Sequence, residues 1–157
     1  KSGRYSVAYP IRIGAALAGA DARRMSALAE AGEWTGLAFQ LRDDLLGALG
    51  DSAITGKPSG DDIREGKRTV LVAEALQLMS DPDAKELAAA LGNQDVDADT
   101  LTRVQHALLT SGAVAAVEAR IAEAEGAAFA ALDDSGASQA QLAPLRGLIA
   151  AATRRHA

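Results

Sequence analysis

One helical stripe of polar residues carries the strongest chemical signal in the sequence. Its members are spaced i, i+4, i+7, i+8 and i+11, and they are Gly36, Gln40, Asp43, Asp44 and Gly47. At 3.6 residues per turn these positions share one face of a helix. Two adjacent carboxylates and an amide cost free energy to bury unless they are paired or bind a cation. The spacing therefore predicts a face that holds a positively charged partner.

The donor atoms on this face favour Mg²⁺. The sequence has no cysteine, so any metal must be held by oxygen or imidazole. Mg²⁺ usually takes one or two carboxylates, keeps several waters and completes its shell with substrate phosphates. We therefore predict Mg²⁺ at Asp43 and Asp44, together with a phosphorylated substrate.

Basic residues follow the stripe closely and are suited to bind the same phosphates. They lie in and just after a Gly-rich polar segment and are Lys57, Arg64, Lys67 and Arg68. Taken alone, an Asp-Asp pair on a helix is most often solvated, and loop charges most often serve solubility. The combination of acidic face and basic loop is what favours a phosphate site.

Hydrophobic spacing and stop signals predict an all-α protein that can position these groups. Alanine is abundant and aromatic residues make up only 3% of the chain, which favours helix over sheet. A polar loop is expected at 50–66, and Ser80 or Asp81 should cap a short helix that ends at Leu91. The other expected helices are 11–19, 22–49, 67–79, 97–110, 113–132 and 138–153.

Composition excludes several classes of function. A net charge of −5 with few aromatic residues argues against a nucleic-acid binder. No apolar run approaches the ~20 residues that span a bilayer, and no signal-peptide pattern is present, so we expect a cytoplasmic protein without a transmembrane segment. The 157 residues suffice for one domain. Because the sequence starts at Lys1 without a Met, we expect upstream residues to be missing.

Several motifs in series resemble the second aspartate-rich region of the isoprenyl (polyprenyl) diphosphate synthase family. They are Phe39-Gln40-Leu41-Arg42-Asp43-Asp44-Leu45-Leu46, then Gly50-Asp51, Gly56-Lys57 and Gly66-Lys67. Upstream, Lys1-Ser2-Gly3 is similar to the Lys-Thr segment of that family, with Ser in place of Thr. The resemblance covers about the first seventy residues, and the later helices carry no diagnostic motif.

The resemblance implies an isoprenoid synthase-type helical bundle, of which residues 1–157 are the C-terminal part. Within it, residues 1–49 hold the motif helices, 50–66 a phosphate-binding loop and 67–157 the C-terminal helices. It implies a trans-prenyltransferase that condenses isopentenyl diphosphate with an allylic diphosphate to a linear product, for which geranylgeranyl diphosphate is expected. It also implies Mg²⁺ and a homodimer.

Site roles follow from the same resemblance, position by position. Asp43 would ligate Mg²⁺, and Asp44 would support that metal and the lysines. Gln40 and Ser2 would line the reacting centre. The residues expected to hold the allylic diphosphate are Lys1, Lys57 and Lys67.

The sequence departs from the family pattern in two places. Gly47 stands where the second aspartate-rich motif usually has a third Asp, and the first aspartate-rich motif, which binds further Mg²⁺, has no counterpart. Neither Asp61-Asp62 nor Asp133-Asp134 is a credible substitute, because both pairs are expected to be surface or capping residues.

Three alternatives remain open at this stage. A non-catalytic subunit or regulator would keep the second motif and act by pairing with a complete partner. A class I terpene cyclase shares the fold and metal chemistry, but it usually surrounds its carbocation with aromatic rings, which are scarce here. The third alternative is a helical interaction module with a solvated polar stripe.

Overall fold

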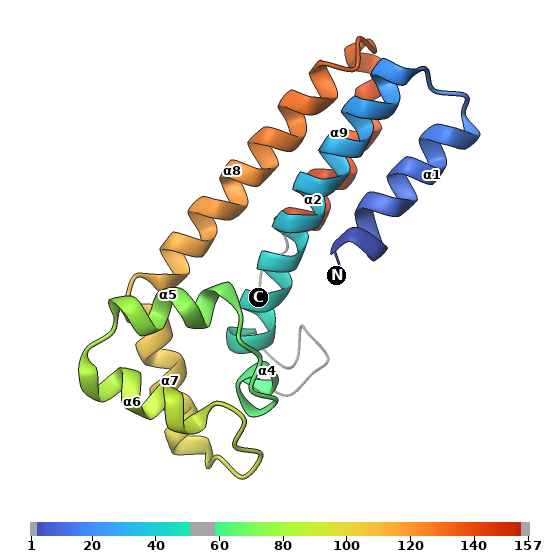
Figure 1. The fold of residues 1–157 in the computed structure, drawn as a ribbon. Coiled ribbons are helices and arrows are strands. Elements are labelled where there is room, and N and C mark those ends of the chain that lie inside the picture. The colour runs from blue at the N-terminus through green and yellow to red at the C-terminus, as the bar shows by residue number, and fades with distance from the viewer. Residues whose placement is uncertain (1–2, 51–58, 155–157) are drawn as a thin grey trace. The chain divides into compact units, whose positions relative to one another are not determined.

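The computed structural model describes residues 3–50 and 59–154, and every regular element in these ranges is helical, which confirms the all-α prediction. None of the described helices is long and apolar enough to cross a membrane. The elements, shown in Figure 1, are η1 (Arg4–Ala8, a π-helix), α1 (Tyr9–Leu17), α2 (Ala22–Leu49), α4 (Asp61–Arg64), α5 (Val70–Leu78), α6 (Asp81–Ala90), α7 (Ala98–Thr110), α8 (Ala113–Asp133) and α9 (Gln139–Thr153).

The helix ends follow local capping chemistry. Asp97 accepts a hydrogen bond of 2.8 Å from the backbone N–H of Thr100, and Ser138 forms a capping box with Gln141. Ser80 accepts from a backbone N–H at the start of α6, as predicted. The helix expected from residue 67 begins only at Val70, since Thr69 is the residue that caps it.

The predicted loop 50–66 is wrong in one respect. Residues 61–64 form the short helix α4, and both Asp62 and Ile63 are buried in it. Gly60 precedes the helix at φ 72° and Gly66 follows it at the same φ, a left-handed conformation that glycine adopts without strain. Burial of Ile63 anchors the turn, which composition alone did not reveal. Residues 51–58 of this segment lie outside the described residues.

The chain divides into two compact units, which are described separately. Among the described residues, unit 1 comprises 3–42 and 120–154, and unit 2 comprises 43–50 and 59–119. Helices α2 and α8 contribute residues to both.

In unit 1, small residues let the N-terminal segment approach α2 closely. A Cβ atom on Gly36 would lie 2.8 Å from the carbonyl oxygen of Gly3, and one on Gly32 would lie 3.1 Å from Cα of Ala8. On another side of α2, Ala31 belongs to a core that joins it to α8 and α9, which run alongside it in Figure 1. The buried members of this core are Ala31, Ala128, Ala131, Leu132, Leu142 and Ile149.

The end of α9 is fastened to the rest of unit 1 by polar contacts. The buried Arg42 donates from Nε to the backbone carbonyl of Thr153 at 2.8 Å. The Thr153 hydroxyl donates to Glu125 at 2.8 Å, and Arg154 makes a bidentate contact with the same carboxylate. Burial raises the pKa of Glu125, but the hydrogen bonds from Arg154 and Thr153 outweigh it, so this pKa lies below its ordinary value.

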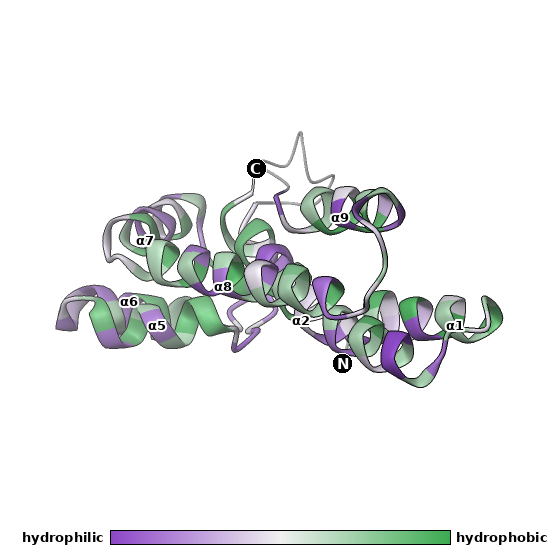
Figure 2. Cartoon of the chain, turned by 90° about the horizontal axis from the view of Figure 1, so that it is seen from above, coloured by the Kyte–Doolittle hydropathy of each residue, from purple (hydrophilic) through white to green (hydrophobic). Residues whose placement is uncertain are grey.

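In unit 2, α5 consists mainly of hydrophobic residues, as the colouring in Figure 2 shows. Its Leu71, Val72 and Ala75 are buried, and so are Leu87 of α6 and Leu108 of α7. These side chains supply much of the apolar burial within unit 2.

The close approach at Gly36 predicts a cost for any side chain there. Gly36→Ala should destabilise the protein by about 1–3 kcal/mol, because a methyl group would be forced against the Gly3 carbonyl. Urea unfolding measures the effect. The control is Gly126→Ala in α8, where nothing lies within 4 Å of the added Cβ and the gain in helix propensity should stabilise by about 0.5–1 kcal/mol. Equal effects of the two substitutions would contradict this packing.

The Glu125 contacts predict a dependence of stability on pH. Because the folded pKa of Glu125 is lowered, its contribution is present above the ordinary value of 4.5 and is lost as the pH falls through the folded value. Glu125→Gln should cost about 0.5–1 kcal/mol at pH 7, and less at pH 4. Urea unfolding of both proteins at the two pH values measures this, and a difference that grows on acidification would contradict it.

Candidate functional site

The two carboxylates of the predicted metal site lie on α2 in unit 2. Asp43 is exposed and Asp44 is half-buried. The Asp43 carboxylate makes no hydrogen bond or ion pair with the described part of the chain. The Asp43 oxygens thus lie near solvent, where a hydrated cation can reach them.

Gly47 follows one turn later on the same face, since it is i+4 from Asp43 and i+3 from Asp44. Another residue lies close to the position that a side chain would take there. A Cβ atom at this position would collide with the carboxyl carbon and both carboxylate oxygens of Asp62. The Asp62 carboxylate therefore occupies the space that a side chain at position 47 would take.

Asp62 is buried, and it is paired with a partly exposed cation. Its side chain is only 9% exposed, and its Oδ1 lies 2.5 Å from Nζ of Lys67. Lys67 also lies 2.9 Å from the exposed carboxylate of Glu65. Hydrogen bonds to Asp62 first and to Glu65 second raise the pKa of Lys67 above its ordinary value. The lysine is therefore a permanent cation at this site.

The prediction that Asp62 is a surface or capping residue is wrong. Gly47 is a signal that could have indicated its burial, because a glycine on a polar helix face leaves room for a group from elsewhere. Asp61, its neighbour, is only half-buried.

Segments distant in sequence hold the α4 turn in place. The backbone N–H of Gly92 donates to the Ile63 carbonyl at 2.9 Å, and the Gln94 amide donates to the Arg64 carbonyl at 2.9 Å. Gln105 of α7 donates from Nε2 to the carbonyl of Ala48 at 2.8 Å and to the Ser59 hydroxyl at 2.9 Å. Gln105 thus ties the end of α2 to the segment before α4, and sequence reasoning had assigned it no role.

The remaining predicted residues are placed as follows. Lys1, Ser2 and Lys57 lie outside the described residues. Arg64 directs its guanidinium to the Ser59 carbonyl at 2.9 Å, and Arg68 is exposed.

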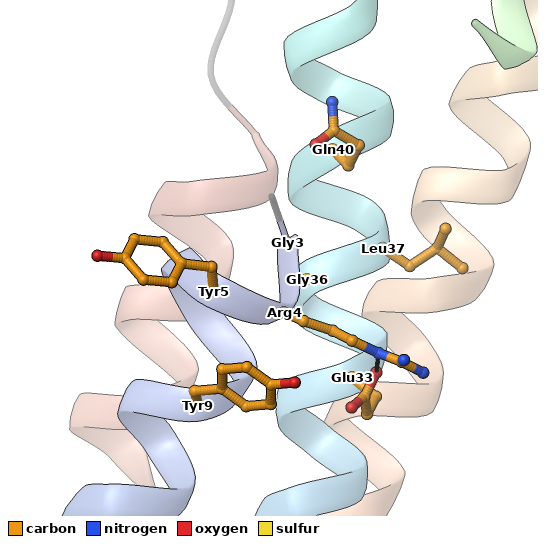
Figure 3. A pocket seen from close by; sticks show the side chains of 8 residues that line it. All are labelled: Gly3, Arg4, Tyr5, Tyr9, Glu33, Gly36, Leu37 and Gln40. Carbon is orange, nitrogen blue, oxygen red and sulfur yellow. Dashed lines mark hydrogen bonds and ion pairs between the residues drawn. The ribbon is translucent and has the colours of Figure 1, made fainter. Parts of the chain in front are cut away.

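Gln40 is half-buried in unit 1 and lines an open pocket there, shown in Figure 3. Arg4 reaches across the pocket to Glu33 with an Nε to Oε2 distance of 2.8 Å. The lining residues are Gly3, Arg4, Tyr5, Tyr9, Glu33, Gly36, Leu37 and Gln40. The pocket is formed where the N-terminal segment meets α2, and it is the place to which the predicted Gln40 contributes.

The donor set fits Mg²⁺ only with help from a ligand. Residues 3–50 and 59–154 contain no group of three or more His, Cys, Asp or Glu side chains that could hold a metal alone. A pair of carboxylates matches the habit of Mg²⁺, which takes few protein ligands and completes its shell with water and phosphate.

A model of the polyprenyl synthetase family matches residues 1–108 of the sequence. The chain belongs to the polyprenyl synthetase family. The match includes every motif named above, and it agrees with the resemblance found from those motifs. Family membership also accounts for the all-helical fold.

Curated members of the family are similar to parts of this chain. A short chain isoprenyl diphosphate synthase of Methanocaldococcus jannaschii is 42% identical over 86 residues, which are 55% of this chain and 26% of that protein. A geranylgeranyl diphosphate synthase of Mycobacterium tuberculosis is 47% identical over 77 residues, which are 49% of this chain and 22% of that protein. The matches thus span about a quarter of the length of these relatives.

Two solved structures are similar to this chain over nearly its whole length. The geranylgeranyl pyrophosphate synthase of Corynebacterium glutamicum, complexed with isoprenyl diphosphate and magnesium, superposes with a TM-score of 0.91 at 41% identity. The match covers 98% of this chain and 44% of that one. A polyprenyl synthase of Caulobacter crescentus, complexed with calcium and isoprenyl diphosphate, gives 0.81 at 31% identity over 96% of this chain and 46% of that one.

The exposed Asp43 predicts metal-dependent binding of an anion. Asp43→Asn should weaken binding of inorganic pyrophosphate in the presence of Mg²⁺ by about tenfold or more, since a neutral amide is a poor ligand for a hard cation. Isothermal titration calorimetry measures the affinity. Glu30→Gln removes an exposed carboxylate elsewhere on α2 and serves as the control. Equal affinities of the two variants would contradict a role for Asp43.

Proposed function

We propose that the protein containing this chain is a Mg²⁺-dependent prenyltransferase that joins isopentenyl diphosphate to an allylic diphosphate. Membership of the polyprenyl synthetase family supports the reaction class. The bond between the allylic carbon and the diphosphate oxygen breaks, and its electron pair leaves with the diphosphate. The alkene of isopentenyl diphosphate then supplies the electron pair of the new carbon–carbon bond, and a proton is lost.

The observation that carries the proposal is the arrangement around Gly47. It combines two carboxylates near solvent, a permanent ammonium group at Lys67 and a buried carboxylate that holds this ammonium group. Charge develops on the departing diphosphate, so fixed cations directed at it lower the barrier. Bound Mg²⁺ would supply further positive charge to the leaving group.

The roles of the individual residues form part of the proposal. Asp43 and Asp44 hold the metal, and Lys67 contacts a diphosphate oxygen. Gln40, which lines the pocket beside α2, contributes to the reacting centre. Lys1, Ser2 and Lys57 are assigned by the family resemblance alone.

Geranylgeranyl diphosphate is the proposed product. Two relatives support this product, because the Mycobacterium tuberculosis and Corynebacterium glutamicum proteins are both named as geranylgeranyl diphosphate (pyrophosphate) synthases. Other relatives are named for farnesyl or geranylfarnesyl products. We further propose a cytoplasmic homodimer, to which exposed apolar residues such as Trp34 and Leu37 of α2 would contribute.

The test is incorporation of labelled isopentenyl diphosphate by the complete protein with Mg²⁺ and allylic primers of different length. The expected result is a product that EDTA abolishes and whose chromatographic mobility matches the C20 diphosphate. Asp43→Asn should lower kcat by about a hundredfold or more, as loss of a single transition-state contact often does. Wild-type protein that is folded and makes no product would contradict the proposal and favour the non-catalytic subunit.

A further inference from the structure

We propose that Asp62 is the residue that positions Lys67 for an anionic ligand, and that position 47 must be glycine because the Asp62 carboxylate fills the space of a side chain there. The inference rests on the proposed function in one respect, namely that Lys67 meets a diphosphate. The rest of the inference is supported by the contacts among Gly47, Asp62 and Lys67, which all belong to unit 2.

The Asp62 side chain of α4 fits against α2 at Gly47. The three heavy atoms nearest to a Cβ atom at position 47 all belong to the Asp62 carboxyl group. A larger residue at 47 would therefore displace the Asp62 carboxylate first. An aspartate at 47 would in addition place two negative charges together in a space where one side chain is only 9% exposed.

Burial of the Asp62 carboxylate has a cost in free energy. A carboxylate removed from water is destabilising unless a cation or hydrogen bonds compensate it. Lys67 provides the compensation at 2.5 Å, while 45% of its own side chain stays exposed. Asp62 therefore fixes the ammonium group from the buried side and leaves its other side open to solvent.

Lys67 has more hydrogen-bond donors than its two carboxylate partners use. An ammonium group has three N–H donors. Asp62 and Glu65 take two of them within the described residues. The remaining donor is available to a phosphate oxygen, and its direction is set because the flexible side chain is already held.

The two carboxylates beside Lys67 have different roles. Asp62 is buried, so its contact with the ammonium group is poorly screened. The Glu65 side chain is 46% exposed, so water screens its contact with the ammonium group. Glu65→Gln is therefore the matched control, since it removes the same charge from the same lysine without disturbing the fit to Gly47.

The experiment measures binding of inorganic pyrophosphate in the presence of Mg²⁺ by the complete protein, with the melting temperature of each variant recorded alongside. Asp62→Asn should weaken binding by about tenfold or more, as loss of a residue that orients a ligand-holding group typically does. Glu65→Gln should bind at least as tightly as the wild type. Equal affinity of Asp62→Asn and the wild type would overturn the positioning role.

Moving the carboxylate from position 62 to position 47 tests the fit between Asp62 and Gly47. Gly47→Asp alone should weaken binding at least as much as Asp62→Asn. Combining it with Asp62→Ala removes the three colliding atoms and returns one carboxylate to the same space, so the double variant should bind more tightly than either single variant. A double variant no better than Gly47→Asp would overturn the complementarity.

An NMR measurement separates this inference from the proposed function. The ¹⁵Nζ signal of Lys67 reports on the ammonium group without any ligand. The contact with Asp62 should slow hydrogen exchange of this group in the wild type, and this slowing should be lost in Asp62→Asn but not in Glu65→Gln. If the wild type makes no prenyl product while this pattern holds, only the proposed function fails. If the Lys67 signal is the same in all three proteins, the positioning role fails whatever the enzymatic result.

Discussion

The contact between the Asp62 carboxylate and the backbone of α2 at Gly47 is the constraint on which the placement of Asp62 and Lys67 in unit 2 depends. A charge is buried there because a helix lacks one side chain and a lysine lies within 2.5 Å. Each partner requires the others. With a side chain at 47 the carboxylate would be displaced, and without Lys67 it would be an unpaired buried charge. The glycine that departs from the family motif thus leaves the space that the Asp62 carboxylate occupies.

Unit 1 uses the same physical device for a different purpose. At Gly32 and Gly36 the absence of a side chain lets the N-terminal segment approach α2 backbone to backbone. The polar contacts of Arg42, Glu125 and Arg154 then fasten the end of α9. Helix α2 therefore carries small residues both where another backbone must lie close and where another side chain must fit. Its apolar pattern alone explains neither requirement.

The sequence predicted the helices well because their signals are local. Periodicity and caps at Asp97 and Ser138 depend on residues within one or two turns, and the predicted range 22–49 agrees with α2. The family resemblance, which rests on short motifs, is confirmed over residues 1–108. The burial of Asp62 and the bridging amide of Gln105 were missed, because both depend on contacts between segments far apart in the chain. The catalytic and ligand-binding roles stay predictions.

The most direct test of the account is a crystal structure of the complete protein with Mg²⁺ and inorganic pyrophosphate. The account predicts a metal on the Asp43 and Asp44 side of α2, with a phosphate oxygen within hydrogen-bond distance of Lys67 Nζ. It also predicts that the Asp62 carboxylate stays against Gly47. Pyrophosphate bound away from Lys67, or an Asp62 side chain turned out into solvent, would contradict it.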